Sequence, residues 1–220
     1  MSAPSLRQQT KQQIEKSRSG NPLFMQSVDE IIAAAKKFET GADALAVGLA
    51  APQFELPDAA GKVVSLAELL AKGPVVVTFY RGSWCPYCSL QLKALQEVLP
   101  EIHMLGGSLV AISPQVPDSS LNSSEKAAMD FTVLSDQDAR TAKEYGVSWE
   151  VPERILQHMR DDRKLDLESI NNGNANILPI PATFVLNPQG VVTWRFVDVD
   201  YRTRAEPSDI ISELRKISAM

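Results

Sequence analysis

Residues 75–88 read VVVTFYRGSWCPYC, and this stretch decides the fold. Its first six residues are all β-branched or aromatic, a run that predicts a strand buried on both faces. Arg81, Gly82 and Ser83 follow, and these residues suit a turn. After Cys85, large apolar residues recur at helical spacing, namely Leu90, Leu92, Leu95, Val98 and Leu99. The stretch therefore predicts a central strand that turns directly into a helix bearing two cysteines.

Cys85 and Cys88 fall at the start of this predicted helix. Pro86 suits the position, because a proline in the first turn gives up an N–H that has no helical partner. Side chains three residues apart share a helix face, roughly 5–6 Å apart at Cβ, so a small adjustment gives disulfide geometry. The positive helix end, and Arg81 four residues earlier, favour a thiolate at Cys85. We therefore expect Cys85 to have the lower pKa of the pair.

A thiolate beside a second thiol can attack a disulfide or a peroxide, after which the second thiol resolves the intermediate as an intramolecular disulfide. A zinc site would need two further ligands. His103 and His158 are the only histidines, and they lack the short spacing of a zinc finger. The sequence therefore predicts reversible thiol redox catalysis, with no metal and no cofactor.

Composition places the chain among ordinary globular proteins, with 220 residues, 44% hydrophobic residues and a net charge of −5. No basic patch is interleaved with aromatic residues, so we expect no nucleic-acid partner. Residues 1–9 lack the apolar core of a signal peptide, and no apolar run approaches the roughly 18 residues of a membrane span. We therefore expect a cytoplasmic protein, in which a close cysteine pair is more often catalytic than structural.

Two parts are expected: a helical extension over residues 1–46 and the main domain over residues 47–220. Within the extension, residues 22–39 carry an apolar stripe at helical spacing, made of Phe24, Val28, Ile31, Ile32, Ala35 and Phe38. One interpretation is a helix packed on its own domain. The alternative is an arm that packs on a second subunit in a homodimer. A membrane-surface helix is the weakest reading, because Lys36 and Lys37 alone make a poor basic face.

The rest of the chain alternates strands and helices up to about residue 146, and then returns as a hairpin followed by a helix. Residues 147–176 fit no pattern well, apart from a possible helix over 152–160. The other expected elements are a hairpin over 51–64, strands at 109–113 and 131–135, helices at 118–129 and 136–145, a hairpin over 180–197 and a helix from Ser208. This order predicts an α/β fold, a central mixed sheet with helices on both faces.

The chain resembles the thioredoxin-fold superfamily and, within it, the peroxiredoxin-like (alkyl hydroperoxide reductase / thiol-specific antioxidant) family. The resemblance covers about residues 47–217 and rests on VGLAAPQFELPDAAGKVVSL, VVVTFY and ATFVLNPQGVV, in that order. The family usually carries Pro-x-x-x-Thr-x-x-Cys around its attacking cysteine. The overlay puts Arg81 at the proline, Cys85 at the threonine and Cys88 at the attacking cysteine. The chain therefore lacks the motif's proline and threonine.

Thioredoxin-like proteins offer a second overlay. Residues 84–88, WCPYC, are similar to their Trp-Cys-x-x-Cys, in which the first cysteine is the exposed nucleophile, and CPYC is also the glutaredoxin pair. Pro181 resembles the cis-proline that lies opposite the cysteines in thioredoxins, where peroxiredoxins often have an arginine. An ordinary trans proline at the start of a strand is the alternative. The chain thus resembles a peroxiredoxin-like body with a thioredoxin-like redox centre.

The resemblance implies an antioxidant thiol peroxidase whose Cys85–Cys88 disulfide is regenerated by thioredoxin, glutaredoxin or glutathione. A thiol:disulfide oxidoreductase with little peroxidase activity is the close alternative, and a non-catalytic redox sensor is a third. Cys85 and Cys88 are the expected catalytic residues. The expected substrate contacts are Arg81, Trp84, Pro86, Tyr87 and Pro181.

Overall fold

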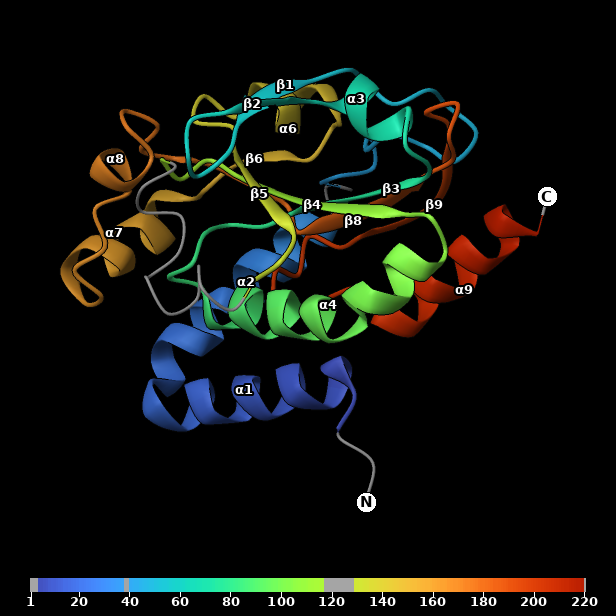
Figure 1. The fold of residues 1–220 in the computed structure, drawn as a ribbon. Coiled ribbons are helices and arrows are strands. Elements are labelled where there is room, and N and C mark those ends of the chain that lie inside the picture. The colour runs from blue at the N-terminus through green and yellow to red at the C-terminus, as the bar shows by residue number, and fades with distance from the viewer. Residues whose placement is uncertain (1–3, 38–39, 117–128, 220) are drawn as a thin grey trace.

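The computed structural model describes residues 4–37, 40–116 and 129–219. Its centre is a five-stranded mixed sheet in the order β5-β4-β3-β8-β9 (Figure 1). The first three of these strands are mutually parallel, and β8 and β9 run antiparallel to their neighbours. Their bounds are β3 Val75–Phe79, β4 Ser108–Ser113, β5 Thr132–Ser135, β8 Ala182–Leu186 and β9 Val192–Val197. The predicted α/β fold with a mixed sheet is confirmed.

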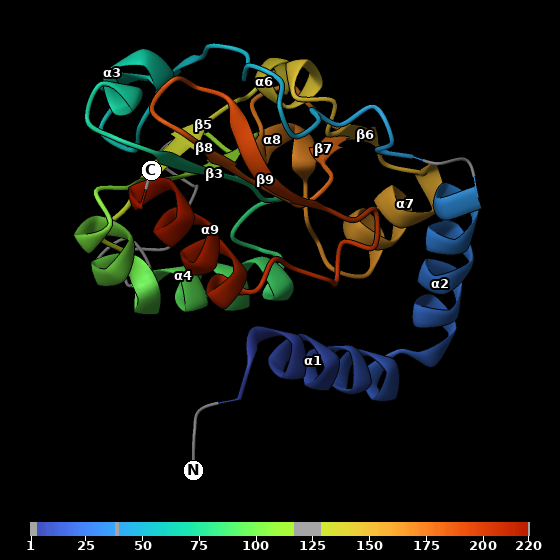
Figure 2. The same ribbon diagram turned by 90° about the vertical axis from the view of Figure 1, so that its right-hand side faces the viewer.

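Helices cover both faces of the sheet. The cysteine-bearing helix α4 (Pro86–Met104) and the last helix α9 (Pro207–Ser218) lie on one face (Figures 1 and 2). The other face carries α3 (Leu66–Leu70), α6 (Arg140–Glu144) and the hairpin of β1 (Glu55–Pro57) with β2 (Val63–Ser65). Every residue of β3 is fully buried. Val76 joins one apolar cluster, and the valines on either side of it join another. The prediction that this strand is buried on both faces is confirmed.

Polar contacts in the core fix helix α4 against the sheet. Gln91 of α4 is 1% exposed, and its Nε2 donates to Oγ1 of Thr78 on β3 over 3.0 Å. The Thr78 hydroxyl also lies 2.9 Å from the Thr183 hydroxyl on β8. Because a buried amide is costly to leave unpaired, these contacts favour one position of the helix. They therefore help to hold the cysteine turn at one place above the sheet.

The N-terminal helices α1 (Leu6–Gly20) and α2 (Pro22–Lys37) pack on the same chain (Figure 2). Val28 and Ile32, from the centre of the apolar stripe, are 0% and 4% exposed and join the core cluster that contains both cysteines. Packing on the chain's own domain is thus confirmed. Phe24 and Ile31 of the same stripe stay partly exposed, and the expected homodimer through residues 22–39 remains a prediction. Phe38, at the end of the stripe, lies outside the described residues.

An ion-pair network also joins α2 to the body. Arg202 Nη1 donates to Asp29 Oδ1 over 2.7 Å, and its Nε donates to Asp200 Oδ1 over 2.8 Å. On its outer side, Asp29 accepts a hydrogen bond from Arg18 of α1 at 2.8 Å. The hydrogen bond from Arg202 lowers the pKa of Asp29 below its usual value. The network therefore links both N-terminal helices to the loop that precedes α9.

Asp29→Asn is expected to lower the free energy of unfolding by about 1 kcal/mol at pH 7. The figure is modest because the carboxylate is partly exposed and Arg202 keeps Asp200. Since the folded pKa is depressed, the contribution of Asp29 is present above the ordinary carboxyl pKa of about 4, and it is lost as pH falls through the folded value. Urea unfolding of wild type and Asp29→Asn at pH 7 and near pH 2 measures this contribution to the free energy of unfolding. Glu30→Gln, at an exposed pair with Arg154, is the control and should change little.

Residues 147–176 form more structure than the sequence indicated. The expected helix is present as α7 (Glu153–Asp161), followed by the short α8 (Leu167–Ile170). Nothing in the sequence indicated the hairpin between β6 (Ser148–Glu150) and β7 (Ile177–Pro179), since 26 residues separate its paired ends Glu150 and Ile177. A separate small apolar cluster lies beneath these elements. The helix expected at 118–129 lies almost wholly outside the described residues.

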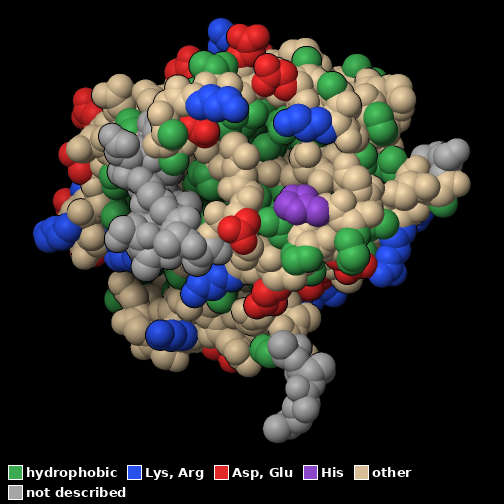
Figure 3. Space-filling view, in the orientation of Figure 1, with side chains coloured by type: hydrophobic (Ala, Val, Ile, Leu, Met, Phe, Trp, Pro, Cys, Tyr) green, Lys and Arg blue, Asp and Glu red, His purple; other side chains and the backbone are tan. Residues whose placement is uncertain are grey.

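Among the helices described, none is long and apolar enough to cross a membrane. On the face drawn in Figure 3, basic and acidic side chains are interspersed, with no large area of one sign. This distribution gives that face no broad positive surface of the kind that binds nucleic acid.

Candidate active site

The turn between β3 and α4 depends on one glycine. Gly82 has a φ of +147°, outside the range that residues with a Cβ usually adopt. A Cβ on Gly82 would overlap Nε1 of Trp84 and lie 3.0 Å from Oε1 of Gln115. Gln115 in turn accepts the backbone N–H of Ser83 over 2.6 Å. The turn therefore has room for no side chain at this position, and it directs the next residues into the first turn of α4.

Gly82→Ala is expected to destabilise the protein by roughly 2–4 kcal/mol, because it combines backbone strain with a steric overlap in a buried turn. Thermal unfolding measures the loss. Gly48→Ala is a matched control, since Gly48 also has a positive φ, of +91°, but open space around its Cβ position. The control should cost about 1 kcal/mol, the backbone part alone. Equal losses in the two variants would contradict the proposed overlap with Trp84.

The two thiols lie in contact beneath this turn. Cys85 is the N-cap residue of α4, and Cys88 is in its first turn; they are 1% and 0% exposed. Their side chains are hydrogen-bonded to each other. Arg204, from the loop before α9, donates from Nη2 to Cys88 Sγ over 3.2 Å. The arginine is itself 6% exposed, and its Nη1 donates to the carbonyl oxygens of Tyr201 and Thr203.

These contacts reverse the expected order of the two pKa values. Burial raises the pKa of Cys85, and the hydrogen bond to Cys88 raises it further. Burial also opposes ionisation of Cys88, but the hydrogen bond from Cys85 and the charge of Arg204 outweigh it and hold the pKa of Cys88 well below its usual value. The prediction that Cys85 has the lower pKa is therefore wrong. The helix end is present, but a buried cation next to Cys88 has the larger effect.

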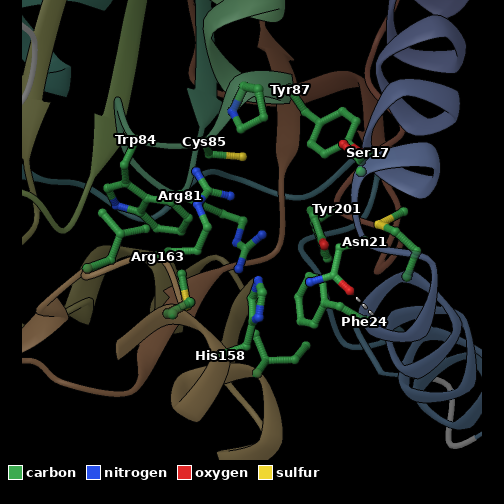
Figure 4. A pocket seen from close by; sticks show the side chains of 16 residues that line it. Ser17, Asn21, Phe24, Arg81, Trp84, Cys85, Tyr87, His158, Arg163 and Tyr201 are labelled. Atoms are coloured by element: carbon green, nitrogen blue, oxygen red, sulfur yellow. Dashed lines mark hydrogen bonds between the residues drawn. The ribbon is translucent and has the colours of Figure 1, made fainter. Parts of the chain in front are cut away.

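A cavity of about 210 Å³ leads to Cys85 (Figure 4). We call it the thiol cavity. The helices of the N-terminal extension form one wall, α7 and the chain after it form another, and the cysteine turn closes the inner end. Its lining includes Ser17, Asn21, Phe24, Arg81, Trp84, Cys85, Pro86, Tyr87, His158, Arg163 and Tyr201. Cys88 is not among the lining residues, so the cavity reaches only the first thiol of the pair.

Aromatic rings surround Arg81 at the inner end of the thiol cavity. Its Cζ lies 4.1 Å from the centre of the Tyr201 ring and 5.1 Å from that of Trp84. Burial raises the pKa of Tyr201 to about 12, so this residue is a neutral phenol at pH 7. Tyr87 packs edge-on against Tyr201, with 5.9 Å between ring centres, and its hydroxyl donates to Oγ of Ser17 over 3.4 Å.

Four of the five expected substrate contacts line this cavity: Arg81, Trp84, Pro86 and Tyr87. Their roles remain predictions. Pro181 does not line it, and the peptide bonds of the described residues are all trans. The expected cis-proline is therefore wrong. Pro181 is instead buried directly before β8, where the alternative reading had placed an ordinary strand-entry proline.

Sequence reasoning missed the residues that come from distant parts of the chain. Arg204 is 116 positions from Cys88, and nothing in its local sequence marks it as buried. The available signal was compositional: residues 200–204, DYRTR, place an aromatic and two arginines together in a loop. Phe24 and His158 were also missed as a pair, and their rings stack with centres 3.4 Å apart. This contact joins the extension to α7 across the cavity.

No group of three or more histidine, cysteine or acidic side chains that could hold a metal ion occurs in residues 4–37, 40–116 and 129–219.

The chain is similar in sequence to proteins of known class. The chain is 33% identical over 103 residues to a protein named peroxiredoxin Bcp from Escherichia coli, covering 47% of this chain and 65% of that protein. It is 30% identical over 170 residues to a chloroplastic peroxiredoxin Q from Populus jackii, covering 77% and 66%. It thus spans slightly less than two thirds of these relatives' own lengths.

Solved structures show the same fold. A peroxidoxin BcpB from Mycobacterium tuberculosis superposes with a TM-score of 0.60 at 22% identity, covering 78% of this chain and 97% of that one. A 2-Cys peroxiredoxin from Plasmodium vivax gives a TM-score of 0.58 at 19% identity, with coverages of 79% and 82%. The sequence profile of the AhpC/TSA family matches residues 47–195, which include β3, the cysteine turn and the β8–β9 hairpin. The chain therefore belongs to the AhpC/TSA family.

Proposed function

We propose that this protein is a thiol peroxidase that reduces hydroperoxides through a reversible Cys85–Cys88 disulfide. The observation that carries the proposal is the contact between Arg204 Nη2 and Cys88 Sγ, which are 3.2 Å apart and belong to two buried residues. A charge-assisted hydrogen bond of this kind stabilises a thiolate, the form of cysteine that attacks peroxide. Cys88 is therefore the attacking residue, as the peroxiredoxin overlay implies.

The oxidative half of the reaction uses both thiols. The Cys88 thiolate attacks one oxygen of the hydroperoxide, the O–O bond breaks, and the leaving alkoxide takes up a proton to give an alcohol, or water from hydrogen peroxide. Cys88 becomes a sulfenic acid. The Cys85 thiol, already in contact with Cys88, then attacks this sulfur, and the disulfide forms with release of water.

The reductive half begins at the other sulfur. A reductant thiolate attacks Cys85, because Cys85 lines the thiol cavity and Cys88 does not. Cys88 leaves as the thiolate, and the contacts that lower its pKa make it the better leaving group of the two. A second reductant thiol then releases Cys85 and forms the reductant's own disulfide. Thioredoxin, glutaredoxin and glutathione are the candidate reductants.

One observation favours a second function, thiol:disulfide exchange on other molecules. Only Cys85 of the pair lines the thiol cavity, and Cys85 is the position that attacks substrate in the thioredoxin overlay. The trans peptide bond at Pro181 and the raised pKa of Cys85 both disfavour this reading. We therefore rank it second.

The two functions are separated by one comparison of rates. Stopped-flow consumption of hydrogen peroxide and reduction of insulin disulfides are measured on the same reduced protein, with the Cys85→Ser/Cys88→Ser double variant as the blank. The peroxidase proposal expects peroxide to react at least about 10²-fold faster than the uncatalysed thiol reaction of free cysteine at equal pH, with little insulin reduction. Rapid insulin reduction with slow peroxide consumption would assign the exchange function instead.

The remaining expectations belong to the same proposal. A cytoplasmic location suits a site that must return to the dithiol form. The division into residues 1–46 and 47–220 separates the helices that wall the thiol cavity from the family domain. A homodimer through residues 22–39 remains part of the proposal, and sedimentation of the full chain tests it.

A further inference from the structure

The thiol cavity is larger than hydrogen peroxide requires. Its volume of about 210 Å³ compares with roughly 30 Å³ for one water in the liquid, and hydrogen peroxide is only slightly larger than water. Apolar and aromatic side chains provide most of the wall, including Phe24, Trp84 and Tyr87. A small organic molecule with an apolar part therefore fits the space that leads to Cys85.

The charged side chains that line this cavity, among the described residues, are arginines. Arg81 and Arg163 line it, and none of the described residues that do so is an aspartate or a glutamate. His158 also contributes a ring, turned toward Asp162 on the outer side. An enclosed space with arginines and no carboxylate has a positive potential, and it favours an anionic group on whatever enters.

Arg81 has no acceptor for its guanidinium among the described residues. Its side chain is buried, with the residue 3% exposed, yet its guanidinium makes no hydrogen bond or ion pair among the described residues, and its Nε is a buried donor with no acceptor. The two aromatic rings stabilise the charge only in part. A buried guanidinium normally has an anion and acceptors for its five N–H groups.

The neighbouring arginines show what Arg81 lacks. Arg202 has two carboxylates, Asp29 and Asp200, and Arg204 has the Cys88 sulfur and two carbonyl oxygens. In the reduced protein, a thiolate at Cys88 can balance one of the two cations closest to the thiols, Arg81 and Arg204. In the disulfide, which is the form that the reductant meets, Cys88 carries no charge, so neither cation is balanced by a thiolate.

We propose that Arg81 binds the carboxylate of a small thiol that enters the cavity to reduce the Cys85–Cys88 disulfide. The inference rests on the proposed function, in which the reductant attacks Cys85. It assigns the reductant to the class of carboxylate-bearing, low-molecular-weight thiols. A folded protein would need an exposed sulfur to attack, whereas Cys85 is 1% exposed at the end of a cavity.

The chemistry balances with two molecules of this thiol. The first, as thiolate, attacks Cys85 Sγ, so a mixed disulfide forms and the Cys85–Cys88 bond breaks with the electron pair leaving on Cys88. The second attacks the sulfur of the bound thiol, and Cys85 leaves as a thiolate that takes a proton from water. The protein gains two electrons, and the two small thiols become one disulfide.

The test uses the full-length protein oxidised to the disulfide with diamide, so that no peroxide is involved. Reduction by N-acetylcysteine is compared with reduction by N-acetylcysteine amide, which lacks the carboxylate, and the rates are expressed per thiolate. In wild type the carboxylate-bearing thiol should react at least tenfold faster. In Arg81→Met this preference should fall at least tenfold, and Arg81→Lys should retain most of it. Arg140→Met, at an exposed arginine, is the control and should leave the ratio unchanged.

A second measurement needs no variant. N-acetylalanine has the carboxylate and no thiol, so it should slow reduction of the wild-type disulfide by N-acetylcysteine amide, while N-acetylalaninamide should not. Equal rates with both thiols, together with no inhibition, would overturn the inference and leave the peroxidase proposal standing. A carboxylate preference in the peroxide step instead of the reduction step would also overturn it. Faster reduction of the disulfide by micromolar thioredoxin than by saturating N-acetylcysteine would overturn the inference as well.

Discussion

Replacing Cys88 by serine is expected to abolish the reaction with peroxide, whereas replacing Cys85 should leave the first oxidation intact. The reason is the difference between the two thiols: Arg204 and Cys85 stabilise a thiolate at Cys88, whereas burial keeps Cys85 protonated. In Cys88→Ser we expect peroxide consumption to fall by at least about 10³-fold at pH 7, because the attacking thiolate is missing. In Cys85→Ser we expect one stoichiometric oxidation and then no turnover, because no thiol resolves the sulfenic acid.

Dimedone labelling followed by mass spectrometry distinguishes these outcomes. Cys85→Ser should carry the label on Cys88 after one equivalent of peroxide, and Cys88→Ser should carry little label on Cys85. The double variant is the blank, and the ultraviolet absorbance of the thiolate, followed against pH, compares the pKa values of the two single variants. Labelling of Cys85 in Cys88→Ser at the wild-type rate would make Cys85 the attacking residue. The order of attack would then be the one in the thioredoxin overlay, in which the first cysteine is the nucleophile.

The sequence was sufficient for the local geometry of this site. A β-branched strand, a polar turn with Gly82 and a first-turn proline together predict where both cysteines lie, because each signal acts within a few residues. The hairpin over residues 180–197 was predictable for the same reason, since β8 and β9 are joined by the tight turn at Asn187–Gly190. The fold could therefore be inferred from patterns that operate at short range.

The electrostatics of the site could not be inferred in this way. The helix-end argument chose Cys85, but Arg204 arrives at Cys88 from a loop with no periodic pattern, and an arginine there reads as a surface charge. The cavity also depends on contacts between distant segments, such as the stacking of Phe24 on His158. The stripe over residues 22–39 predicted a buried face without saying what it would be buried against. Contacts between distant parts of the chain decide which thiol ionises, how the cavity forms and where this helix packs.

Arg204→Met is expected to slow the reaction with peroxide by roughly 10²-fold at pH 7, although Arg204 is no part of the cysteine motif. The variant removes the charge and the hydrogen bond at Cys88 Sγ and keeps an apolar side chain of similar length, so the main loss is stabilisation of the thiolate.

The pH dependence identifies this mechanism. The pKa of Cys88 is depressed in wild type, so the thiolate is present above that low value and the rate should change little as pH rises above 7. Without Arg204 the pKa of Cys88 rises, so the rate should increase with pH across this range and the defect should shrink at alkaline pH. Arg204→Lys should recover part of the rate, because the positive charge remains. The recovery should be partial, because an ammonium group lacks the fork with which the guanidinium of Arg204 bridges Cys88 Sγ and the carbonyl oxygen of Thr203. Arg215→Met, at an exposed pair with Glu101, is the matched control and should behave as wild type. A loss of rate in Arg204→Met that is the same at every pH would show that Arg204 holds the loop and not the thiolate.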